Sequence, residues 1–271
     1  IVKRKVAVTR RNFIDVVIDW MKEYDVKCTY IRYIFANTQF IRLLQYQKEN
    51  CIKTLIEIPT YPYDEEILYG RFKVEDNYFR SKIENYVNAI ATYSQDKEIW
   101  GIPCIHLNNG IDIEKIPIAK YKEKDKAITM IAVSSMSLWH GYERVIGGIY
   151  DYYRNGGDWK LCLKLVGEGR ELDKYRKLTE KYGLQPHVKF YGKLEGESLN
   201  QIFDESDLGL VSFGLHKIGI DKASPIKGAE YCARGIPMIC GYHDMRFPKN
   251  TPFVLEVPNN DNPIDMGQVI K

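Results

Sequence analysis

The run Ala127–Val133, AITMIAV, restricts the fold of this chain more than any other stretch. It contains no charged residue, which favours a strand buried on both faces, as central strands of parallel sheets are. Helical and strand-like patterns then alternate, with helices expected at 142–154, 171–182 and 198–205 and strands at 160–166, 188–191 and 208–213. This alternation predicts βαβ crossovers, and therefore an α/β fold with a doubly wound parallel sheet.

The first half of the chain shows a similar but less regular alternation. We expect helices at 12–24, 37–50 and 76–88, and strands at 27–33, 54–58, 89–93 and 104–107. Between the halves, Ile113–Lys126 is rich in charge, contains Pro117 and has no sustained apolar period, which is typical of a linker. We therefore predict two Rossmann-like domains, residues 1–115 and residues 116–271.

The charge and the cysteine content of the chain limit which ligands and partners it can have. A formal net charge of +3 suits an anionic ligand or an anionic membrane surface, but is too small for a nucleic-acid-binding protein. None of the six cysteines forms a C-x-x-C pair or is spaced with histidines as in a zinc site, so no metal site is expected. Without a signal peptide or a transmembrane-length apolar run, we expect a cytoplasmic protein, with peripheral membrane contact left open.

In doubly wound sheets, ligands bind at the carboxyl ends of the strands. The loops there are Ser134–Gly141, Gly167–Gly169, Gly192–Leu194 and Phe213–Lys227. The second loop keeps only two glycines of G-x-G-x-x-G and follows a middle strand, which argues against a nicotinamide or flavin site. In the first loop, His140 can donate to a phosphate oxygen or a sugar hydroxyl; alternatively, it simply packs beside its neighbour Trp139.

The stretch Ser224–Cys240, SPIKGAEYCARGIPMIC, predicts a helix followed by a short strand. A hydroxyl cap at Ser224 before Pro225 is favoured at a helix N-terminus. Such a terminus attracts anions, and Lys227 in the first turn adds positive charge. Glu230, one turn later, can accept hydrogen bonds from a ribose diol. The stretch therefore suits a nucleoside diphosphate, whereas the simpler interpretation is a helix with an isolated lysine and an exposed glutamate.

Several of these loops together resemble the C-terminal domain of GT-B glycosyltransferases of the family four, or group 1, type. The resemblance rests on W-H-G, V-G-E-G, V-K-F-Y-G, D-L and E-Y-C-A-R-G-I-P at residues 139–141, 166–169, 188–192, 207–208 and 230–237. Upstream, Ser94 and Asn109–Asp112 resemble elements that close the N-terminal domain. Ile58–Asp64 resembles a loop of capsule- and exopolysaccharide-type members. The resemblance implies two Rossmann-like domains facing a cleft, with an N-terminal domain incomplete against the family and a short or missing C-terminal crossover helix.

The resemblance also implies an activity. It would be retaining, metal-independent transfer of a hexose-type sugar from a nucleoside diphosphate sugar to a glycan or lipid-linked acceptor in bacterial surface polysaccharide synthesis. The enzyme would lie at the inner face of the plasma membrane, with the nucleotide sugar as co-substrate and no cofactor. The implied catalytic residues are His140, Lys222 and Lys227. The implied donor-binding residues are Ser135, Gly141, Gly167, Tyr191, Gly192, Lys193, Leu194, Ser224, Pro225, Ile226 and Glu230.

Two departures from the family pattern leave alternatives open. Lys222 stands where many members have a glutamate that contacts the donor sugar, and Ser135 or Met136 and His140 replace a basic pair. A catalytically degenerate sugar-nucleotide-binding or scaffold subunit is one alternative. A GT-B sugar-nucleotide epimerase is another, and an assay with the donor alone separates it from a transferase.

Overall fold

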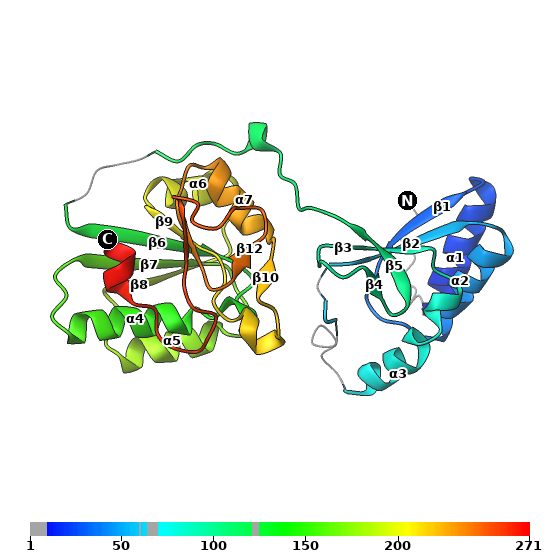
Figure 1. Ribbon diagram of the computed structural model, residues 1–271, viewed down its shortest axis with the longest axis horizontal. Coiled ribbons are helices and arrows are strands. Elements are labelled where there is room, and N and C mark those ends of the chain that lie inside the picture. Colours follow the sequence, from blue (N-terminus) through cyan, green and yellow to red (C-terminus); the bar gives the residue numbers. More distant parts are fainter. Residues whose placement is uncertain (1–9, 60, 64–69, 121–124) are drawn as a thin grey trace. The chain divides into compact units, whose positions relative to one another are not determined.

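The computed structural model describes residues 10–59, 61–63, 70–120 and 125–271, with side chains from residue 13 onward (Figure 1). The chain divides into two compact units, unit 1 to Asn108 and unit 2 from Asn109. Each is built around its own largely parallel sheet. The boundary predicted from the sequence lies slightly further along, after residue 115.

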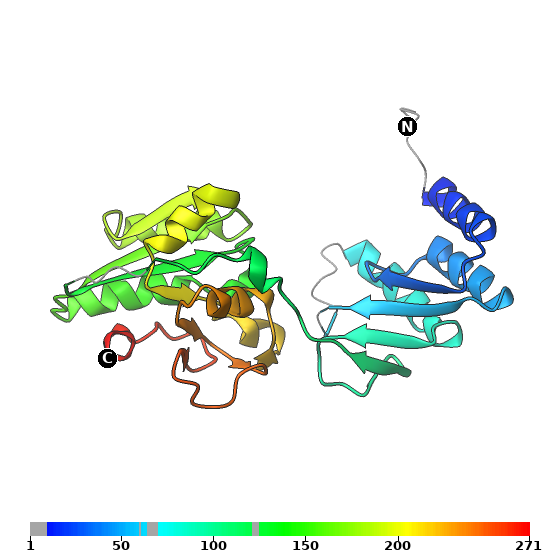
Figure 2. The same ribbon diagram turned by 90° about the horizontal axis from the view of Figure 1, so that it is seen from above.

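Unit 1 contains a five-stranded sheet in the order β1-β2-β3-β5-β4. In Figure 2, its blue and teal strands lie side by side. Only β4 runs antiparallel to its neighbour. The strands are β1 (Cys28–Arg32), β2 (Lys53–Ile58), β3 (Ala89–Thr92), β4 (Glu98–Ile99) and β5 (Ile102–His106); the helices are α1 (Arg10–Glu23), α2 (Thr38–Glu49), α3 (Gly70–Arg80) and the 3-10 turn η2 (Ile83–Asn85).

The predicted helix at 76–88 is wrong in its bounds, because α3 ends at Arg80 and a 3-10 turn follows. The polar residues Asp76 and Arg80 are buried in this helix, so an apolar pattern could not locate it. Arg80 Nε donates to Asp76 Oδ2 at 2.6 Å, while the amide of Ala36 and the hydroxyl of Tyr33 donate to Asp76 Oδ1. This buried network fixes α3 against the loop after β1.

Unit 2 contains a six-stranded, all-parallel sheet in the order β13-β11-β9-β6-β7-β8, which confirms the predicted fold class. The run Ala127–Val133 is strand β6, paired on both sides. The other strands are β7 (Lys160–Val166), β8 (Val188–Gly192), β9 (Leu208–Leu210), β11 (Met238–Cys240) and β13 (Val254–Glu256); β10 (Lys222–Ala223) and β12 (His243–Asp244) pair separately.

The helices of unit 2 cover both faces of this sheet. One core cluster joins β6 and β7 to residues of α4, α5 and α8; a second joins the opposite face to residues of α6 and α7. These helices are α4 (Glu143–Arg154), α5 (Leu172–Lys181), α6 (Gly196–Asp204), α7 (Ile226–Ala233) and α8 (Met266–Ile270). The sequence predicted most of these elements within a few residues, but missed β10, β12, β13 and α8.

The segment after Asn108 is held along α7. The Asn109 side-chain amide donates to the carbonyl oxygen of Ser224 at 2.7 Å, just before α7. The amide of Ala119 donates to the carbonyl oxygen of Arg234 at 2.9 Å, just after α7. The segment from Asn109 to Ala119 therefore touches both ends of the helix that carries Lys227 and Glu230, and the predicted linker supplies the second contact.

Candidate functional site

The chain reverses its direction of winding across the unit 2 sheet between β6 and β9. From β6 it passes to β7 and β8 on one side, and then returns to β9, β11 and β13 on the other. In open α/β sheets the crevice at such a switch point, at the carboxyl ends of the strands, is where ligands bind. The loops that follow β6 and β9, together with the start of α7, therefore define the candidate site.

The loops after β6 and β9 are joined by their backbones. The amide of Phe213 donates to the carbonyl oxygen of His140 at 2.9 Å, and that of Gly214 donates to Trp139 at 3.1 Å. Gly141 has a φ of 62°, and a Cβ there would lie 2.7 Å from the nitrogen of Gly214. Only glycine allows this close approach, so Gly141 has a packing role whether or not it also contacts a donor.

Two further glycines bring the loop after β7 against the loop after β6. A Cβ on Gly167 would lie 1.9 Å from the carbonyl oxygen of Ser134, and one on Gly169 would lie 1.9 Å from that of Ser135. Both glycines have positive φ angles. The incomplete G-x-G-x-x-G pattern thus reflects backbone packing between neighbouring loops.

Tyr231 of α7 packs against the sheet at the switch point, where β6 and β9 end. Its buried hydroxyl donates to the carbonyl oxygen of Leu210 at 3.2 Å and accepts from the amide of Val133 at 3.4 Å. A Cβ on Gly209 would lie 2.4 Å from the Tyr231 ring. One side chain therefore fixes α7 against the ends of β6 and β9. Sequence reasoning missed this residue because a tyrosine in a helix carries no signal of its partners.

His140 is buried and held in one orientation. Its Nδ1 accepts from the amide of Ser137 at 2.8 Å, and its ring stacks on that of Tyr142 with centroids 5.6 Å apart. Burial, with a contribution from the charge of Lys227, lowers the pKa of His140 to about 2. The ring is therefore neutral near pH 7, and because Nδ1 is an acceptor its proton lies on Nε2. His140 is thus both packed and able to donate a hydrogen bond.

The lysine of α7 reaches back toward β9. Its Nζ donates to the carbonyl oxygen of Val211 at 3.0 Å and to the hydroxyl of Tyr142 at 3.4 Å. In the part of the chain that the structure describes, no carboxylate forms an ion pair with Lys227. Desolvation lowers the pKa of Lys227 to about 7. An ammonium with only neutral partners favours a bound anion, which would restore its charged form.

The hydroxyl cap predicted for this helix is wrong. The helix begins at Ile226, and its N-cap is Pro225, which makes no side-chain capping bond. Pro225 adopts an extended ψ of 143° and so lies just outside the helix. The first backbone amides of α7 are thus not satisfied by a capping side chain, as an anion site at a helix terminus requires.

Glu230 is neither isolated nor freely exposed. Its Oε1 accepts from Arg234 Nη2 at 2.9 Å and from Nε at 3.1 Å. Arg234 also donates to Asn200 Oδ1 at 3.0 Å and lies over the Phe203 ring. No bond to Glu230 Oε2 occurs among the described residues, so this oriented carboxylate keeps one acceptor oxygen.

Asp244 and Arg246 brace the start of α7, and sequence reasoning missed both. Arg246 Nη2 donates to the carbonyl oxygen of Pro225 at 2.6 Å and to Asp244 Oδ2 at 2.6 Å. A Cβ on Gly228 would lie 2.7 Å from Arg246 Nη2 and 2.9 Å from Asp244 Oδ2. The Asp244–Arg246 pair therefore packs against the backbone at Gly228, where any side chain would collide with it.

The remaining predicted site residues lie around the same sheet edge. Gly192 and Gly167 are joined, since the amide of Gly167 donates to the carbonyl oxygen of Gly192 at 2.7 Å. Lys193 pairs with Glu195 at 2.7 Å on the exposed surface, whereas Leu194 packs against the second core cluster. Lys222 is an exposed residue of β10, and Ser135 is also exposed. Tyr191 is about one-third exposed.

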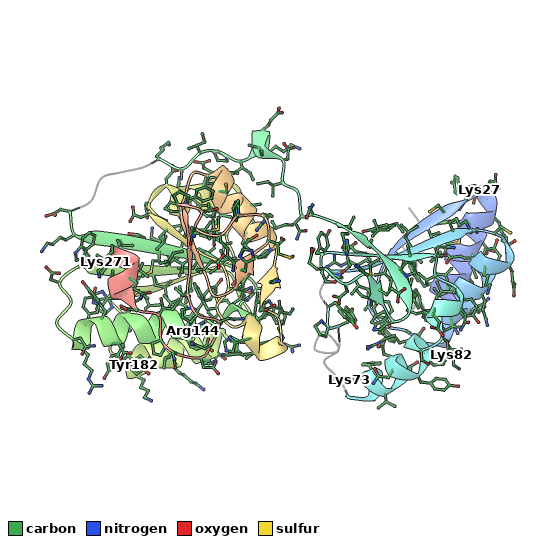
Figure 3. All side chains as sticks on the ribbon, in the orientation of Figure 1. Lys27, Lys73, Lys82, Arg144, Tyr182 and Lys271 are labelled. Carbon is green, nitrogen blue, oxygen red and sulfur yellow. The ribbon has the colours of Figure 1, made fainter. Side chains whose placement is uncertain are left out.

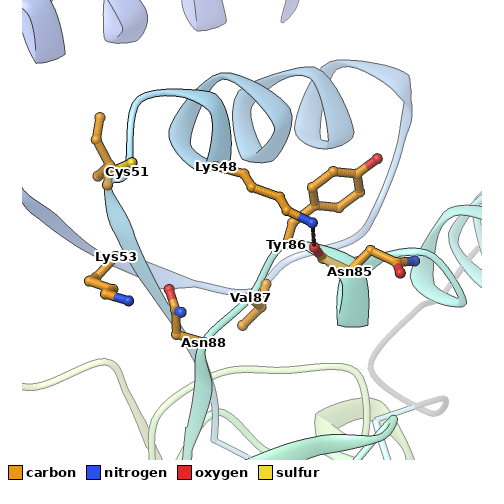
Figure 4. Close-up of a pocket in the computed structure, with 8 residues that line it drawn as sticks. Lys48, Cys51, Lys53, Asn85, Tyr86, Val87 and Asn88 are labelled. Carbon is orange, nitrogen blue, oxygen red and sulfur yellow. Dashed lines mark hydrogen bonds between the residues drawn. The ribbon is translucent and has the colours of Figure 1, made fainter.

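A shallow pocket of about 320 Å³ lies elsewhere, in unit 1 (Figure 4). Lys48 donates to the carbonyl oxygen of Asn85 at 2.8 Å within it, and Lys53 and Asn88 line it. Lys53 begins β2 and Asn88 precedes β3, so the pocket lies at the amino ends of these strands, opposite to the edge where ligands bind.

Over the described ranges, no group of three or more His, Cys, Asp and Glu side chains is arranged to hold a metal ion. None of the described helices is both long enough and apolar enough to cross a membrane.

Comparison with known proteins identifies relatives of this architecture. Residues 114–246 match the family described as "Glycosyl transferases group 1". A glycosyltransferase from Rickettsia africae is 14% identical, with a TM-score of 0.68 over 99% of this chain and 72% of that one. HepE from Anabaena in complex with UDP is 15% identical, with a TM-score of 0.65 over 95% and 71%.

A third solved structure has the same architecture. Sucrose-phosphate synthase from Thermosynechococcus elongatus is 15% identical, with a TM-score of 0.64 over 100% of this chain and 69% of that one. HepE has also been solved with UDP-glucose. No curated protein sequence matches this chain. At such low identities the solved structures show a shared fold, whereas the family match covers the residues of the candidate site.

Proposed function

We propose that this chain is a group 1 glycosyltransferase of the GT-B fold that transfers a sugar from a nucleoside diphosphate sugar to a glycan or lipid-linked acceptor. We further propose that the reaction is retaining and independent of metal ions, and that it serves bacterial surface polysaccharide synthesis. The observation that carries the donor assignment is Lys227, an ammonium with neutral partners in the first turn of α7.

We propose that the donor diphosphate binds at the start of α7. The backbone amides near Ile226, the helix dipole and Lys227 Nζ all favour negative charge there. The same groups stabilise the charge that develops on the leaving diphosphate as the glycosidic bond breaks. This arrangement supports a mechanism in which protein groups, including Lys222, supply the positive charge that a metal ion provides in other transferases.

The rest of the donor is assigned by the chemistry of the remaining groups. The free oxygen of Glu230 accepts from the ribose hydroxyls, and Arg234 holds that carboxylate in place. His140 donates from Nε2 to a phosphate oxygen or a sugar hydroxyl. The base lies against Tyr191–Leu194. The complexes of HepE with UDP and UDP-glucose support a uridine nucleotide as the first donor to test.

A stripe on α1 supports peripheral contact with a membrane at the inner face of the plasma membrane. Phe13, Val16 and Trp20 lie on one side of this helix, Tyr24 directly follows it, and these four side chains are between 46% and 71% exposed. Aromatic and apolar side chains on one face of a helix favour the bilayer interface. Co-sedimentation with phosphatidylglycerol vesicles tests this contact, and a Phe13→Ser/Trp20→Ser variant that sediments as well as the wild type would contradict it.

The donor assignment is tested by thermal shift against UDP, GDP, ADP and CMP sugars, followed by transfer assays with the donor that stabilises the protein. Specific binding raises the melting temperature by mass action. We expect one nucleotide class to stabilise the protein, and Glu230→Ala and Lys227→Ala to lose most of the stabilisation and transfer. Undiminished transfer in both variants would reject the site.

Two measurements test the reaction type. NMR of the first product should show the donor's anomeric configuration, because a retaining enzyme preserves it. Activity should persist after treatment with EDTA. An inverted product or a loss of activity restored by Mg²⁺ would reject the corresponding part of the proposal.

A further inference from the structure

Arg144 is a buried arginine in the first turn of α4 (Figure 3). It is only 3% exposed. Its Nη1 donates to the carbonyl oxygen of Phe213 at 2.8 Å, its Nε to that of Asn262 at 2.7 Å and its Nη2 to that of Pro258 at 2.8 Å. One guanidinium therefore joins three segments: the start of α4, the loop after β9 and the loop before α8.

The position of Arg144 is unfavourable for a cation. The N-terminus of a helix carries positive dipole charge, and burial removes the guanidinium from water. Desolvation accordingly lowers its pKa. Its hydrogen-bond acceptors are backbone carbonyls and the side chain of Asn260, at 3.3 Å, rather than a carboxylate. An apolar residue would avoid these costs, so the value of Arg144 lies in the segments that its planar fork connects.

The segment held by Arg144 forms one wall of the candidate donor site. The carbonyl oxygen of Phe213 accepts from Arg144, and the amide of Phe213 donates to the carbonyl oxygen of His140. Two residues before Phe213, the Val211 carbonyl accepts from Lys227 Nζ. The loop that carries Pro258 and Asn262 also holds the next part of this wall, because Asn259 accepts from the amide of His216 and donates to the carbonyl of Ile220.

We propose that Arg144 is a positioning residue for the donor diphosphate. It acts through Phe213 and the loop at 258–262, which together set the distance between His140 and Lys227. The role rests on the proposed function, because it concerns the same donor site. Without the three hydrogen bonds of Arg144, the loop after β9 is no longer held in one conformation, and the Val211 carbonyl no longer fixes Lys227 Nζ. The groups that donate hydrogen bonds to the diphosphate then adopt a wider range of positions.

The test compares UDP and GDP binding by calorimetry in the full chain for wild type, Arg144→Lys and Arg144→Met. Lysine keeps the charge but cannot form the three-way fork. We expect both variants to bind the preferred diphosphate about tenfold more weakly or worse, in line with the loss of positioned charged hydrogen bonds. Binding is measured well below each melting temperature, with circular dichroism to show that the variants remain folded.

Arg80→Lys is the matched control, because Arg80 is also a buried arginine, at 8% exposed, but lies in unit 1. We expect it to lower the melting temperature without changing diphosphate affinity. Hydrogen exchange gives a readout that needs no ligand: Arg144→Lys should accelerate exchange of the amides at 213–220, which Arg80→Lys should leave unchanged.

The outcomes separate the two proposals. If wild type binds neither UDP nor GDP, the donor site itself is rejected, and the role of Arg144 with it. If the wild type binds UDP or GDP and both Arg144 variants bind that nucleotide with the same affinity as the wild type, only the positioning role is rejected. If Arg144→Lys accelerates exchange and weakens binding while Arg80→Lys does neither, the positioning role is supported.

Discussion

The Nζ atom of Lys227 lies 3.0 Å from the carbonyl oxygen of Val211, the first residue after strand β9. The Tyr142 hydroxyl also donates to that carbonyl, at 3.2 Å. A lysine, a tyrosine and a carbonyl thus converge where the sheet changes its direction of winding, without a carboxylate bonded to the lysine among the described residues. This relationship makes Lys227 the best candidate for binding an anion.

Removing the ammonium should weaken donor binding more than it weakens the fold. For Lys227→Met we expect a loss of about tenfold to a hundredfold in UDP or GDP affinity, the range for a hydrogen bond to a charged group. The melting temperature should change little or rise, because a partly buried, desolvated charge is removed. Calorimetry and thermal unfolding measure the two effects. Lys177→Met, which removes an exposed lysine of α5 outside the proposed site, is the control and should bind normally.

Donor binding should depend on pH above neutrality. The pKa of Lys227 in the free protein is about 7, and a bound diphosphate raises it. Binding therefore takes up a proton at higher pH, and affinity should fall by up to about tenfold per pH unit above pH 7. His140, with a pKa near 2, and Tyr142, with a raised pKa, face Lys227 and do not titrate there.

Calorimetry of UDP binding at pH 7 to 9 in buffers of different ionisation enthalpy counts the protons taken up. In Lys227→Arg the uptake should disappear, because arginine stays charged over this range. An affinity that is flat over this range in the wild type would contradict the assignment.

Glu230 should discriminate ribose from deoxyribose. Wild type should prefer UDP over 2′-deoxy-UDP, or the corresponding pair for its own base, by about tenfold, because a carboxylate acceptor is left unpaired by the deoxy sugar. Glu230→Ala should bind both nucleotides equally. Glu256→Ala removes another carboxylate of unit 2, paired with His243 at 2.7 Å, and should keep the preference. A preference that survives Glu230→Ala would place the ribose elsewhere.

His140 should make the fold sensitive to acid. Its pKa is about 2 in the native protein and about 6.5 when unfolded. Below pH 6.5 the unfolded chain binds the extra proton, so the free energy of unfolding should fall as pH falls, by about 2 kcal/mol at pH 5. His140→Asn keeps an acceptor for the amide of Ser137 and cannot titrate. Urea unfolding between pH 5 and 8 should therefore show a flatter pH dependence for this variant.

Gly167 should tolerate no side chain. Its φ is 119°, and a Cβ would meet the Ser134 carbonyl oxygen at 1.9 Å. Gly167→Ala should lower the free energy of unfolding by about 3 kcal/mol or more, through strain and displacement of backbone. Gly183 has a φ of 66° with open space around it, so Gly183→Ala should cost only about 1 kcal/mol. Equal losses in urea unfolding would show that the loop contact is unimportant.

Regular elements were predictable where the apolar pattern is strong. Strand β7 was predicted with its observed bounds, and α4 and α5 to within one residue at each end. Their buried residues follow the period of the element, and glycine or a turn ends each one. The pattern failed at α3, where Asp76 and Arg80 are polar and buried, and at β12, which at two residues is too short to show a period.

The candidate site was predictable only in part. Lys227, Glu230 and His140 were singled out by residue type and by their place after strands. Arg144, Asp244 and Arg246 were missed because nothing in their local sequence distinguishes them from surface charges. Their partners are found only in the folded chain, as with the carbonyl oxygen of Phe213, 69 residues from Arg144.

The sequence by itself determined that unit 2 is a parallel α/β sheet, because local hydrophobic periodicity is set residue by residue. It also determined which loops follow the strands, and hence where the first turn of α7 had to be considered. The tertiary structure decided what those loops contain: a lysine facing neutral groups, a glutamate fixed by Arg234, and a buried arginine that joins three segments. Burial and hydrogen bonding depend on partners distant in the chain, and only folding brings these together.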